Sequence, residues 1–254
     1  MAKVIAPFKI SGTLDDLNFY TTNDGNNYVR MKGKTGITKE EFKNNPVFDP
    51  IREHGKEWGY CSKKGRSFRQ MAALLFQKAK DGSFAGRSIK LLWEILEEDN
   101  TNPKGSRTLE EGFKSRHIPE ILLGFEGNRN RPLHQVLKTD FKYTPEANTL
   151  QIQDFNPESH LAWPMEEATH VQLQMATADW NPTDECSATS YSQELILEKT
   201  HNATITLYTE IPKGNNWKIT FLYIGFLNQQ RRKTHPLHRK YNTASLVACH
   251  PVSS

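Results

Sequence analysis

The chain contains 254 residues, of which 36% are hydrophobic and 24% are charged, and its formal net charge is +4. This composition is typical of a globular protein and excludes the fibrous and low-complexity classes. A chain of this length forms one or two domains, whose core can be large enough to need no metal or disulfide for stability.

A β-hairpin is predicted over residues 8–33. Leu14, Leu17 and Phe19 precede a strong tight-turn signal at residues 23–26, and strand-forming residues follow it at 28–31. An isolated hairpin is only marginally stable in water. We therefore expect this hairpin to dock on another surface, belonging either to its own chain or to a neighbouring molecule.

Helices are predicted next. Thr38 stands three residues before Glu41, which is the spacing of a capping box, and helical signals continue to Trp58. Between residues 66 and 80 apolar side chains recur at intervals of three and four, as in an amphipathic helix, and the pattern repeats from 86 to 99.

Acidic residues 97–99 close that last helix, where the helix dipole disfavours negative charge. We expect these acids to pair with basic residues or to face a partner.

From about residue 134 the hydrophobic period changes to two, which indicates strands. A second hairpin is predicted around a turn at 144–148. Later alternating segments lie near residues 171–175, 191–197, 205–209, 217–223 and 246–248. This series of short strands, with no helical pattern between them, favours an antiparallel sandwich.

The predicted fold class is therefore α+β, with a division near residue 130. Residues 1–130 are expected to form a β-hairpin and a basic helical module, and residues 131–254 an immunoglobulin-like antiparallel β-sandwich.

Charge is distributed unevenly along the chain. Residues 1–145 carry 25 Lys/Arg and 18 Asp/Glu, whereas residues 146–254 carry 8 and 11. The basic excess is concentrated in residues 30–80, which hold 13 basic and 5 acidic residues. Such a stretch is either the solvated face of amphipathic helices or a surface for nucleic acid or an acidic subunit.

Aromatic and basic side chains are interleaved in and next to this stretch. Three explanations stand: packing of the hairpin on the helices, a protein interface rich in Tyr and Arg, and stacking on nucleic-acid bases. The candidate subunit-interface residues are Phe19, Tyr20, Tyr28, Arg30, Arg52, Arg66 and Arg69.

No catalytic, cofactor or metal site is predicted. The phosphate-loop motif fails because no glycine stands five positions before Gly33, and no nucleophile elbow is found. His235, His238, Cys249 and His250 are of the right types to bind a metal, but their spacing matches no structural zinc motif. We therefore expect a non-enzymatic protein that uses no cofactor.

The sequence predicts a cytoplasmic protein with no membrane partner. No run of about 18 apolar residues occurs, and the first apolar stretch breaks at Pro7. Cys61, Cys186 and Cys249 are odd in number and far apart, as expected in a reducing compartment. We expect them to be buried thiols.

Several segments resemble an uncharacterised bacterial protein family. They are residues 12–20, 23–25, 28–30, 45–48, 52–59, 99–107 and 122–128. The likeness covers about residues 8–130, and weakly the strands that follow; His54 stands where asparagine is frequent in the family. The resemblance implies a hairpin-plus-helix module joined to a β-sandwich, and it implies no catalytic residue.

These features favour a structural subunit that assembles with copies of itself into a filament, tube or phage-tail-like particle. The hairpin needs a docking surface, and the oppositely charged halves suit contacts between copies. The alternative is a nucleic-acid-binding protein that uses the basic region of residues 30–80.

Overall fold

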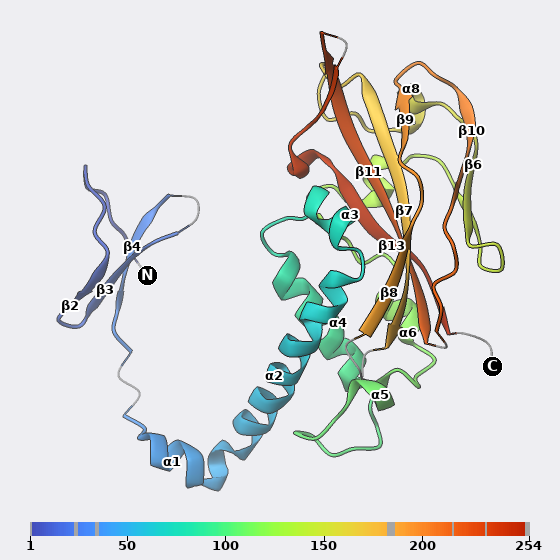
Figure 1. Ribbon diagram of the computed structural model, residues 1–254. Helices are drawn as coiled ribbons and strands as arrows, with labels where there is room; N and C mark the ends of the chain where they lie inside the picture. The colour runs from blue at the N-terminus through green and yellow to red at the C-terminus, as the bar shows by residue number, and fades with distance from the viewer. Residues whose placement is uncertain are drawn as a thin grey trace. The chain divides into compact units, whose positions relative to one another are not determined.

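A computed structural model describes residues 2–22, 25–33, 36–181, 186–214, 216–231 and 233–251, without the side chains of 186 and 187. The chain divides into two compact units, Met1–Asp49 and Pro50–Ser254 (Figure 1). Helix and antiparallel sheet are both abundant, at 30% and 34%, which confirms a mixed fold. The immunoglobulin-like type of the sandwich stays a prediction.

The N-terminal unit is built on a four-stranded antiparallel sheet with the order β1-β4-β3-β2. The predicted hairpin is confirmed as β3 and β4, with Tyr20 opposite Tyr28; its turn residues Asn23 and Asp24 lie outside the described part of the chain. The strands are β1 (Ala2–Lys3), β2 (Gly12–Leu14), β3 (Leu17–Thr21) and β4 (Asn27–Met31).

A short helical segment follows the sheet: α1 (Lys39–Asn44) and the 3-10 helix η1 (Pro46–Phe48). The hydroxyl of Thr38 accepts a hydrogen bond of 3.1 Å from the Glu41 backbone N–H, so the predicted helix start is confirmed.

Asn27 holds the N-terminal sheet to the segment before it. Its side-chain amide donates to the carbonyl oxygens of Ile10 at 2.7 Å and Tyr20 at 3.2 Å, and its Oδ1 accepts from the Ile10 backbone N–H. Among the described residues of this unit, Asn27 alone is almost fully buried. These residues therefore form no apolar core of their own.

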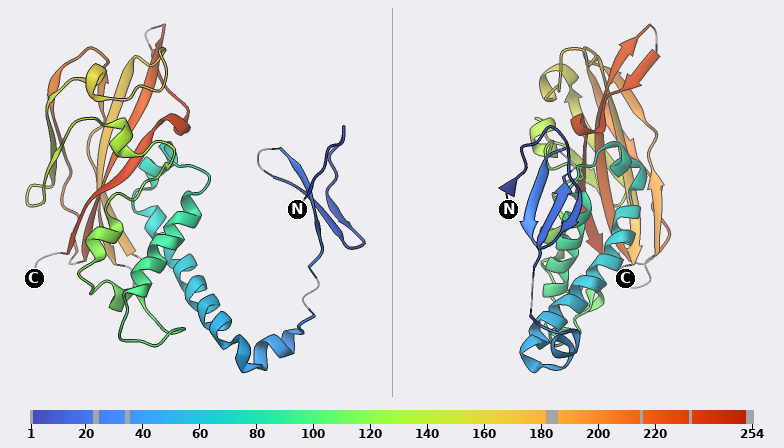
Figure 2. Two further views of the ribbon diagram at one scale, coloured as in Figure 1. Left: turned by 180° about the vertical axis from the view of Figure 1, so that it is seen from behind. Right: turned by 90° about the vertical axis from the view of Figure 1, so that its left-hand side faces the viewer.

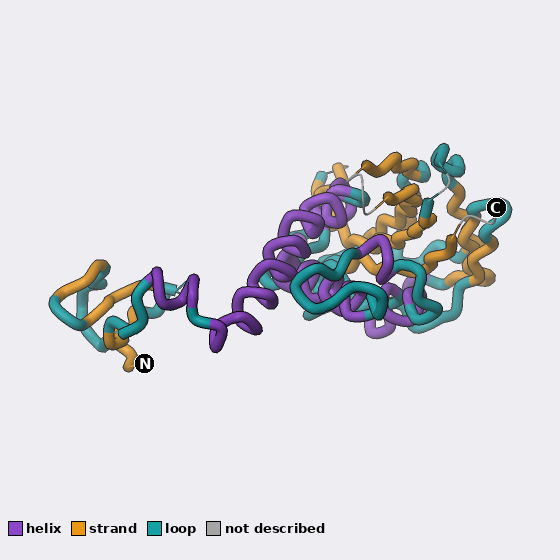
Figure 3. Tube along the Cα trace, turned by 90° about the horizontal axis from the view of Figure 1, so that it is seen from below, coloured by secondary structure: helices purple, strands orange, loops and turns teal. Residues whose placement is uncertain are grey.

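The second unit has three layers: helices, a central six-stranded sheet and a smaller three-stranded sheet (Figures 1 and 2). The helices between residues 49 and 122 gather on one side of the central sheet (Figure 3), whereas Leu133 and Val136 belong to the core on its other side. The helices are α2 (Asp49–Gln70), α3 (Ala73–Lys78), α4 (Phe84–Glu97), α5 (Leu109–Gly112), α6 (Ile118–Leu122), α7 (Leu133–Val136), α8 (Pro157–His160) and the 3-10 helix η2 (Arg239–Tyr241). The smaller sheet, in the order β10-β6-β5, contains β5 (Lys142–Thr144), β6 (Thr149–Phe155) and β10 (Ala203–Tyr208).

Two long antiparallel strands form the middle of the central sheet, β7 (His170–Asn181) and β11 (Trp217–Gln230). Two shorter strands follow one another along the outer side of each. β8 (Cys186–Tyr191) and β9 (Leu195–Glu198) pair with β7, and β12 (Lys233–Pro236) and β13 (Thr243–Pro251) pair with β11. Both flanks of the sheet are therefore interrupted, at residues 192–194 and 237–242.

Alternation along the long strands divides the apolar side chains between two cores. Trp180 and Phe221 face the helices, where the rings of Phe68 and Trp180 meet edge to face at 5.6 Å. Met175 and Leu222 face the smaller sheet and belong to the second core. Strand β7 is buried on both faces because helices cover one and strands the other.

The structure differs from two sequence expectations. The single helix expected over 66–80 is broken, because Ala72 leaves the helical region with φ −124° and ψ 46°. The compact units meet at residue 49, not near 130: residues 61–125 share their core with β7, β11 and β13, so helices and strands form one body.

Candidate functional site

The N-terminal sheet presents an apolar face, defined by Leu14, Leu17, Phe19, Val29 and Met31. Leu17 lies directly opposite both Leu14 and Met31, and Phe19 lies opposite Val29, so all five share one side of the sheet. Leu14 is 66% exposed, Leu17 38% and Met31 68%. An apolar sheet face normally packs against a second layer, and the described part of this unit supplies none.

The opposite side of this sheet is aromatic and basic. The rings of Tyr20 and Tyr28 are stacked with centroids 6.1 Å apart, and the Arg30 guanidinium lies 5.5 Å from the centroid of Tyr20. Cation–π contacts of this kind hold an arginine in place while leaving its charge available. The structure thus brings together three of the seven predicted interface residues and places Phe19 on the other side of the sheet.

The three remaining candidates lie on α2, where they differ in their surroundings. Arg66 is exposed and Arg52 half-buried. Arg69 donates a hydrogen bond of 3.0 Å from Nη1 to the Ser88 hydroxyl on α4. That bond gives Arg69 a role within its own unit.

A basic stripe on α2 is formed by Arg66, one of the predicted interface residues, and by Lys56 and Lys63, which were not singled out from the sequence. At 100° per residue these positions fall within an arc of about 80°. All three side chains are exposed, and no ion pair joins them to any residue that the structure describes. The three residues are separated by seven and then three positions in the sequence, which places them on one face of a helix. This spacing is informative only if a single helix covers all three positions, and the structure shows that α2 does so.

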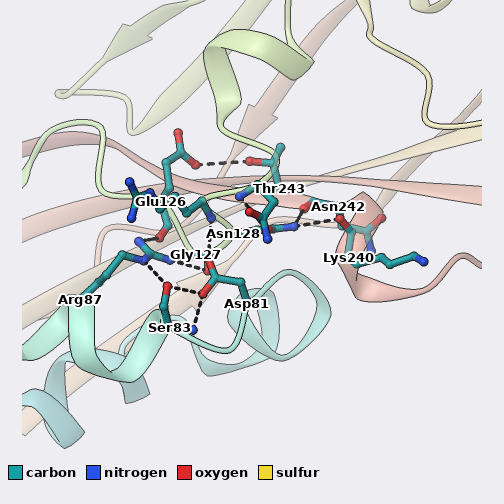
Figure 4. Close-up of polar contacts among 11 residues, drawn as sticks. Asp81, Ser83, Arg87, Glu126, Gly127, Asn128, Lys240, Asn242 and Thr243 are labelled. Carbon is teal, nitrogen blue, oxygen red and sulfur yellow. Dashed lines mark hydrogen bonds and ion pairs between the residues drawn. The ribbon is translucent and has the colours of Figure 1, made fainter. Parts of the chain in front are cut away.

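A network of hydrogen bonds holds residues 126–128 between α4 and β13 (Figure 4). Arg87 donates to the carbonyl oxygens of Glu126 at 2.6 Å and Gly127 at 3.0 Å. The Asn128 side-chain amide donates to the Asn242 carbonyl at 2.9 Å. These bonds give hydrogen-bond partners to backbone carbonyl oxygens where segments distant in sequence lie side by side. We therefore assign the network to stabilisation of the fold.

Glu126 borders a cleft of about 780 Å³. Its carboxylate accepts hydrogen bonds from the Leu133 backbone N–H at 2.8 Å and the Thr243 hydroxyl at 3.4 Å. Burial nevertheless raises the pKa of Glu126 to about 7. Such a carboxyl can exchange a proton near neutral pH, but no hydrogen bond joins it to His134, Lys138 or Asp140, the other titratable side chains on the described cleft wall.

The cysteines and histidines form no reactive cluster in the described ranges. No three side chains of the metal-ligating types gather there, His235 and His238 included. Burial raises the pKa of Cys61 to about 12 and of Cys249 to about 11, so both are protonated thiols at neutral pH. The side chain of Cys186 lies outside the described residues.

None of the helices described is both long and apolar enough to span a membrane. No family model matches the chain, and no curated protein and no solved structure matches it either. Its function is therefore inferred from the surfaces themselves.

Proposed function

We propose that this chain is a non-enzymatic structural subunit that associates with copies of itself through the apolar face of its N-terminal sheet. The observation that carries the proposal is the exposure of Leu14, Leu17 and Met31 in a unit whose described residues form no apolar core. Stable domains bury such a face between two layers.

The partner is the same face of a second copy. Two identical apolar faces packed together supply each other's missing layer and form a two-sheet sandwich, which is the self-complementary contact of a two-fold dimer. A large apolar side chain contributes about 1.5–3 kcal/mol when it is fully buried, so covering the exposed Leu14, Leu17 and Met31 side chains favours association of two copies.

Growth into a filament, tube or phage-tail-like particle needs a second contact, because a two-fold pair is closed. The net charges of residues 1–145 and 146–254 are +7 and −3, which favours attraction between unlike halves of neighbouring copies.

The test compares two neighbouring positions on β2 in the full chain. Leu14→Asp places a charge on the apolar face, whereas Thr13→Asp places the same charge on the other side of the sheet, and both positions are exposed. Sedimentation velocity over a wide concentration range is expected to show self-association of the natural chain and of Thr13→Asp, but not of Leu14→Asp. A monomer of 29.2 kDa at every concentration of the natural chain would overturn the proposal.

A nucleic-acid-binding function is the second candidate, and the basic stripe of Lys56, Lys63 and Arg66 favours it. Replacing all three by Gln is expected to weaken binding to a labelled DNA duplex and to reduce the salt slope by about 0.9 for each phosphate that the protein no longer neutralises. A control with Gln at exposed Lys90, Lys138 and Lys142 is expected to retain the slope. Absence of binding at low salt would exclude this function.

Three finer points belong to the same proposal. The two packed sheets of the second unit support a sandwich of immunoglobulin-like type. The free thiols Cys61 and Cys249 support a cytoplasmic location. The segments quoted above support membership of the bacterial family that they resemble.

A further inference from the structure

A second cleft, of about 270 Å³, lies between the end of α2, α3 and the start of α4. Its wall includes Arg69 from α2 and Lys80 and Asp81 from the turn after α3. On one continuous helix Arg69 and Lys80 would stand about 16 Å apart along the axis. Because the helix breaks at Ala72, the two basic side chains line the same cleft.

Arg69 is held in place at this cleft. Its Nη1 donates a hydrogen bond of 3.0 Å to the hydroxyl of Ser88, which is fully buried and itself donates to the Ala85 carbonyl at 2.8 Å. A guanidinium carries five N–H donors, and no other hydrogen bond joins this one to a residue that the structure describes. Arg69 therefore offers further donors from a fixed position.

Two cations on the cleft wall have no anionic partner. Neither Arg69 nor Lys80 forms an ion pair with any described residue, and both side chains are half-buried. Burial and the charge of the neighbouring Arg66 lower the pKa of Arg69. Removing a charge from water is costly unless an opposite charge compensates it, so these two cations favour an anionic ligand.

Asp81, the acidic residue of the described wall, does not supply that opposite charge. Its Oδ1 accepts hydrogen bonds from the Ser83 backbone N–H at 2.6 Å and the Ser83 hydroxyl at 2.7 Å (Figure 4). Its Oδ2 accepts from Arg87 Nη2 at 2.9 Å and from the Arg129 backbone N–H at 2.7 Å. The Asp81 charge is thus matched by Arg87, and the cleft keeps an excess of positive charge.

We propose that this cleft binds the dianionic phosphate group of a small molecule. The Arg69 guanidinium and the Lys80 ammonium donate to phosphate oxygens, and their two positive charges match the two negative charges of the group. The cleft, of about 270 Å³, is smaller than the range of about 300–1,000 Å³ that is usual for drug-sized ligands, so the ligand is small. This chemistry has two sources, the free phosphate ion and a small phosphate ester. The site is independent of the self-association proposed above.

The test compares two tetrahedral probes that differ in charge. At about pH 8 inorganic phosphate is mostly a dianion, whereas dimethyl phosphate carries a single negative charge. Calorimetric titration of the full chain is made in about 0.15 M NaCl, which screens contacts between exposed charges. Saturable binding of inorganic phosphate is expected, with affinity lower by about tenfold or more for dimethyl phosphate.

Two results would overturn the proposal. One is the absence of phosphate binding. The other is equal binding of dimethyl phosphate, because a site that does not distinguish one charge from two attracts the phosphodiester backbone of nucleic acid equally well.

Two variants assign the contacts. Lys80→Gln and Arg69→Gln are each expected to lower the affinity for inorganic phosphate by about tenfold or more. Arg69→Gln also loses the bond to Ser88, whereas the Lys80 side chain bonds to no described residue, so Lys80→Gln separates loss of binding from loss of stability. Lys104→Gln removes the same charge at an exposed position outside the cleft and is expected to bind as the natural chain does. Unchanged affinity in Lys80→Gln, or an equal loss in Lys104→Gln, contradicts the assignment.

A final comparison distinguishes the two sources. Glycerol 3-phosphate is titrated beside inorganic phosphate under the same conditions. Tighter binding of glycerol 3-phosphate assigns the cleft to a phosphate ester, and tighter binding of inorganic phosphate assigns it to the free ion. Both results support the shared chemistry.

Discussion

Arg107 holds the Glu57 carboxylate with two hydrogen bonds, from Nε to Oε1 at 2.9 Å and from Nη2 to Oε2 at 2.7 Å. The backbone N–H of Gly105 donates a third bond, of 2.8 Å. The Glu57 and Arg107 side chains are only 3% and 11% exposed. The pair therefore fastens the loop before α5 to the middle of α2, and the bonds from Arg107 hold the pKa of Glu57 below its ordinary value.

Breaking this pair is expected to destabilise the second unit strongly. Glu57→Gln leaves the Arg107 charge buried without its partner, and loss of one member of a buried pair costs about 3–5 kcal/mol. The measurement is the free energy of unfolding in urea. Glu94→Gln is the matched control, because Glu94 pairs with Lys90 on the surface of α4, where the change is at most about 0.5 kcal/mol. Equal effects of the two substitutions would contradict this account.

Asn148 is expected to be intolerant of substitution. It is buried with φ +46°, and its Oδ1 accepts hydrogen bonds from the hydroxyls of Tyr143 at 2.8 Å and Thr177 at 3.0 Å. Asn148→Gly permits the positive φ but loses these bonds, at a cost of about 2 kcal/mol. Asn148→Ala adds about 1–2 kcal/mol of backbone strain. The free energy of unfolding in urea should be highest for the natural chain, lower for Asn148→Gly and lowest for Asn148→Ala. A higher value for Asn148→Ala than for Asn148→Gly would contradict the account of backbone strain.

The raised pKa of Glu126 predicts a loss of stability as the pH rises. The folded state holds the proton up to about pH 7, whereas the unfolded chain releases it near the ordinary value of 4.5. Between these values the folded state binds more protons, so the free energy of unfolding falls by about 3 kcal/mol as the pH rises from 4.5 to 7, and Glu126 makes no further contribution to the pH dependence above pH 7.

The difference in unfolding free energy between the natural chain and Glu126→Gln isolates this effect. It should vary with pH only within that window, and a difference independent of pH would show that Glu126 titrates normally. Glu120→Gln, at an exposed position on α6, is the control.

The two described thiols are expected to resist modification. In Cys186→Ser the remaining Cys61 and Cys249 have raised pKa values, of about 12 and about 11. Their thiolate fraction at about pH 8 is therefore very small. Ellman's reagent should detect no rapid thiol in the folded chain and both thiols after unfolding in urea. Rapid reaction of the folded variant at the rate of free cysteine would contradict this prediction.

Local patterns predicted much of the fold. The hairpin of β3 and β4 depends on alternation and a turn within about twenty residues, and the Thr38 cap on one hydrogen bond to a nearby N–H. The alternating segments after residue 142 correspond to strands in the structure, whereas the start expected near residue 134 is wrong: Leu133–Val136 form α7, and β5 begins only at Lys142. These features depend on interactions between residues close together in the sequence, so they can be predicted from the local sequence pattern.

The acidic end of α4 shows what local patterns miss. We expected residues 97–99 to pair with basic side chains or a partner. Instead, the Asp99 carboxylate accepts hydrogen bonds from the backbone N–H groups of Thr101, Asn102 and Thr108 and so folds the following loop. Every residue except proline carries a backbone N–H donor, so the sequence pattern does not indicate which of them will bond to Asp99.

The candidate sites were predicted in part. Tyr20, Tyr28 and Arg30 meet on one side of the N-terminal sheet because a hairpin register is local. The cleft that contains Arg69 collects residues from α2, α3, α4 and the turn between the last two, and only the tertiary fold brings them together. In the same way, Gln172 occupies a polar position of the alternating segment near residues 171–175, and nothing in the sequence indicates that helices cover that face of the strand.

The helix-side core has a consequence for the biosynthesis of the protein. Phe68 and its neighbours leave the ribosome long before Trp180 and Phe221, the aromatic residues on which the helices pack. At about 5–20 residues per second, the apolar side of α2 to α4 is exposed for roughly 5–20 s before the strands that cover it are made. The nascent chain in this interval therefore exposes apolar side chains that the finished protein buries.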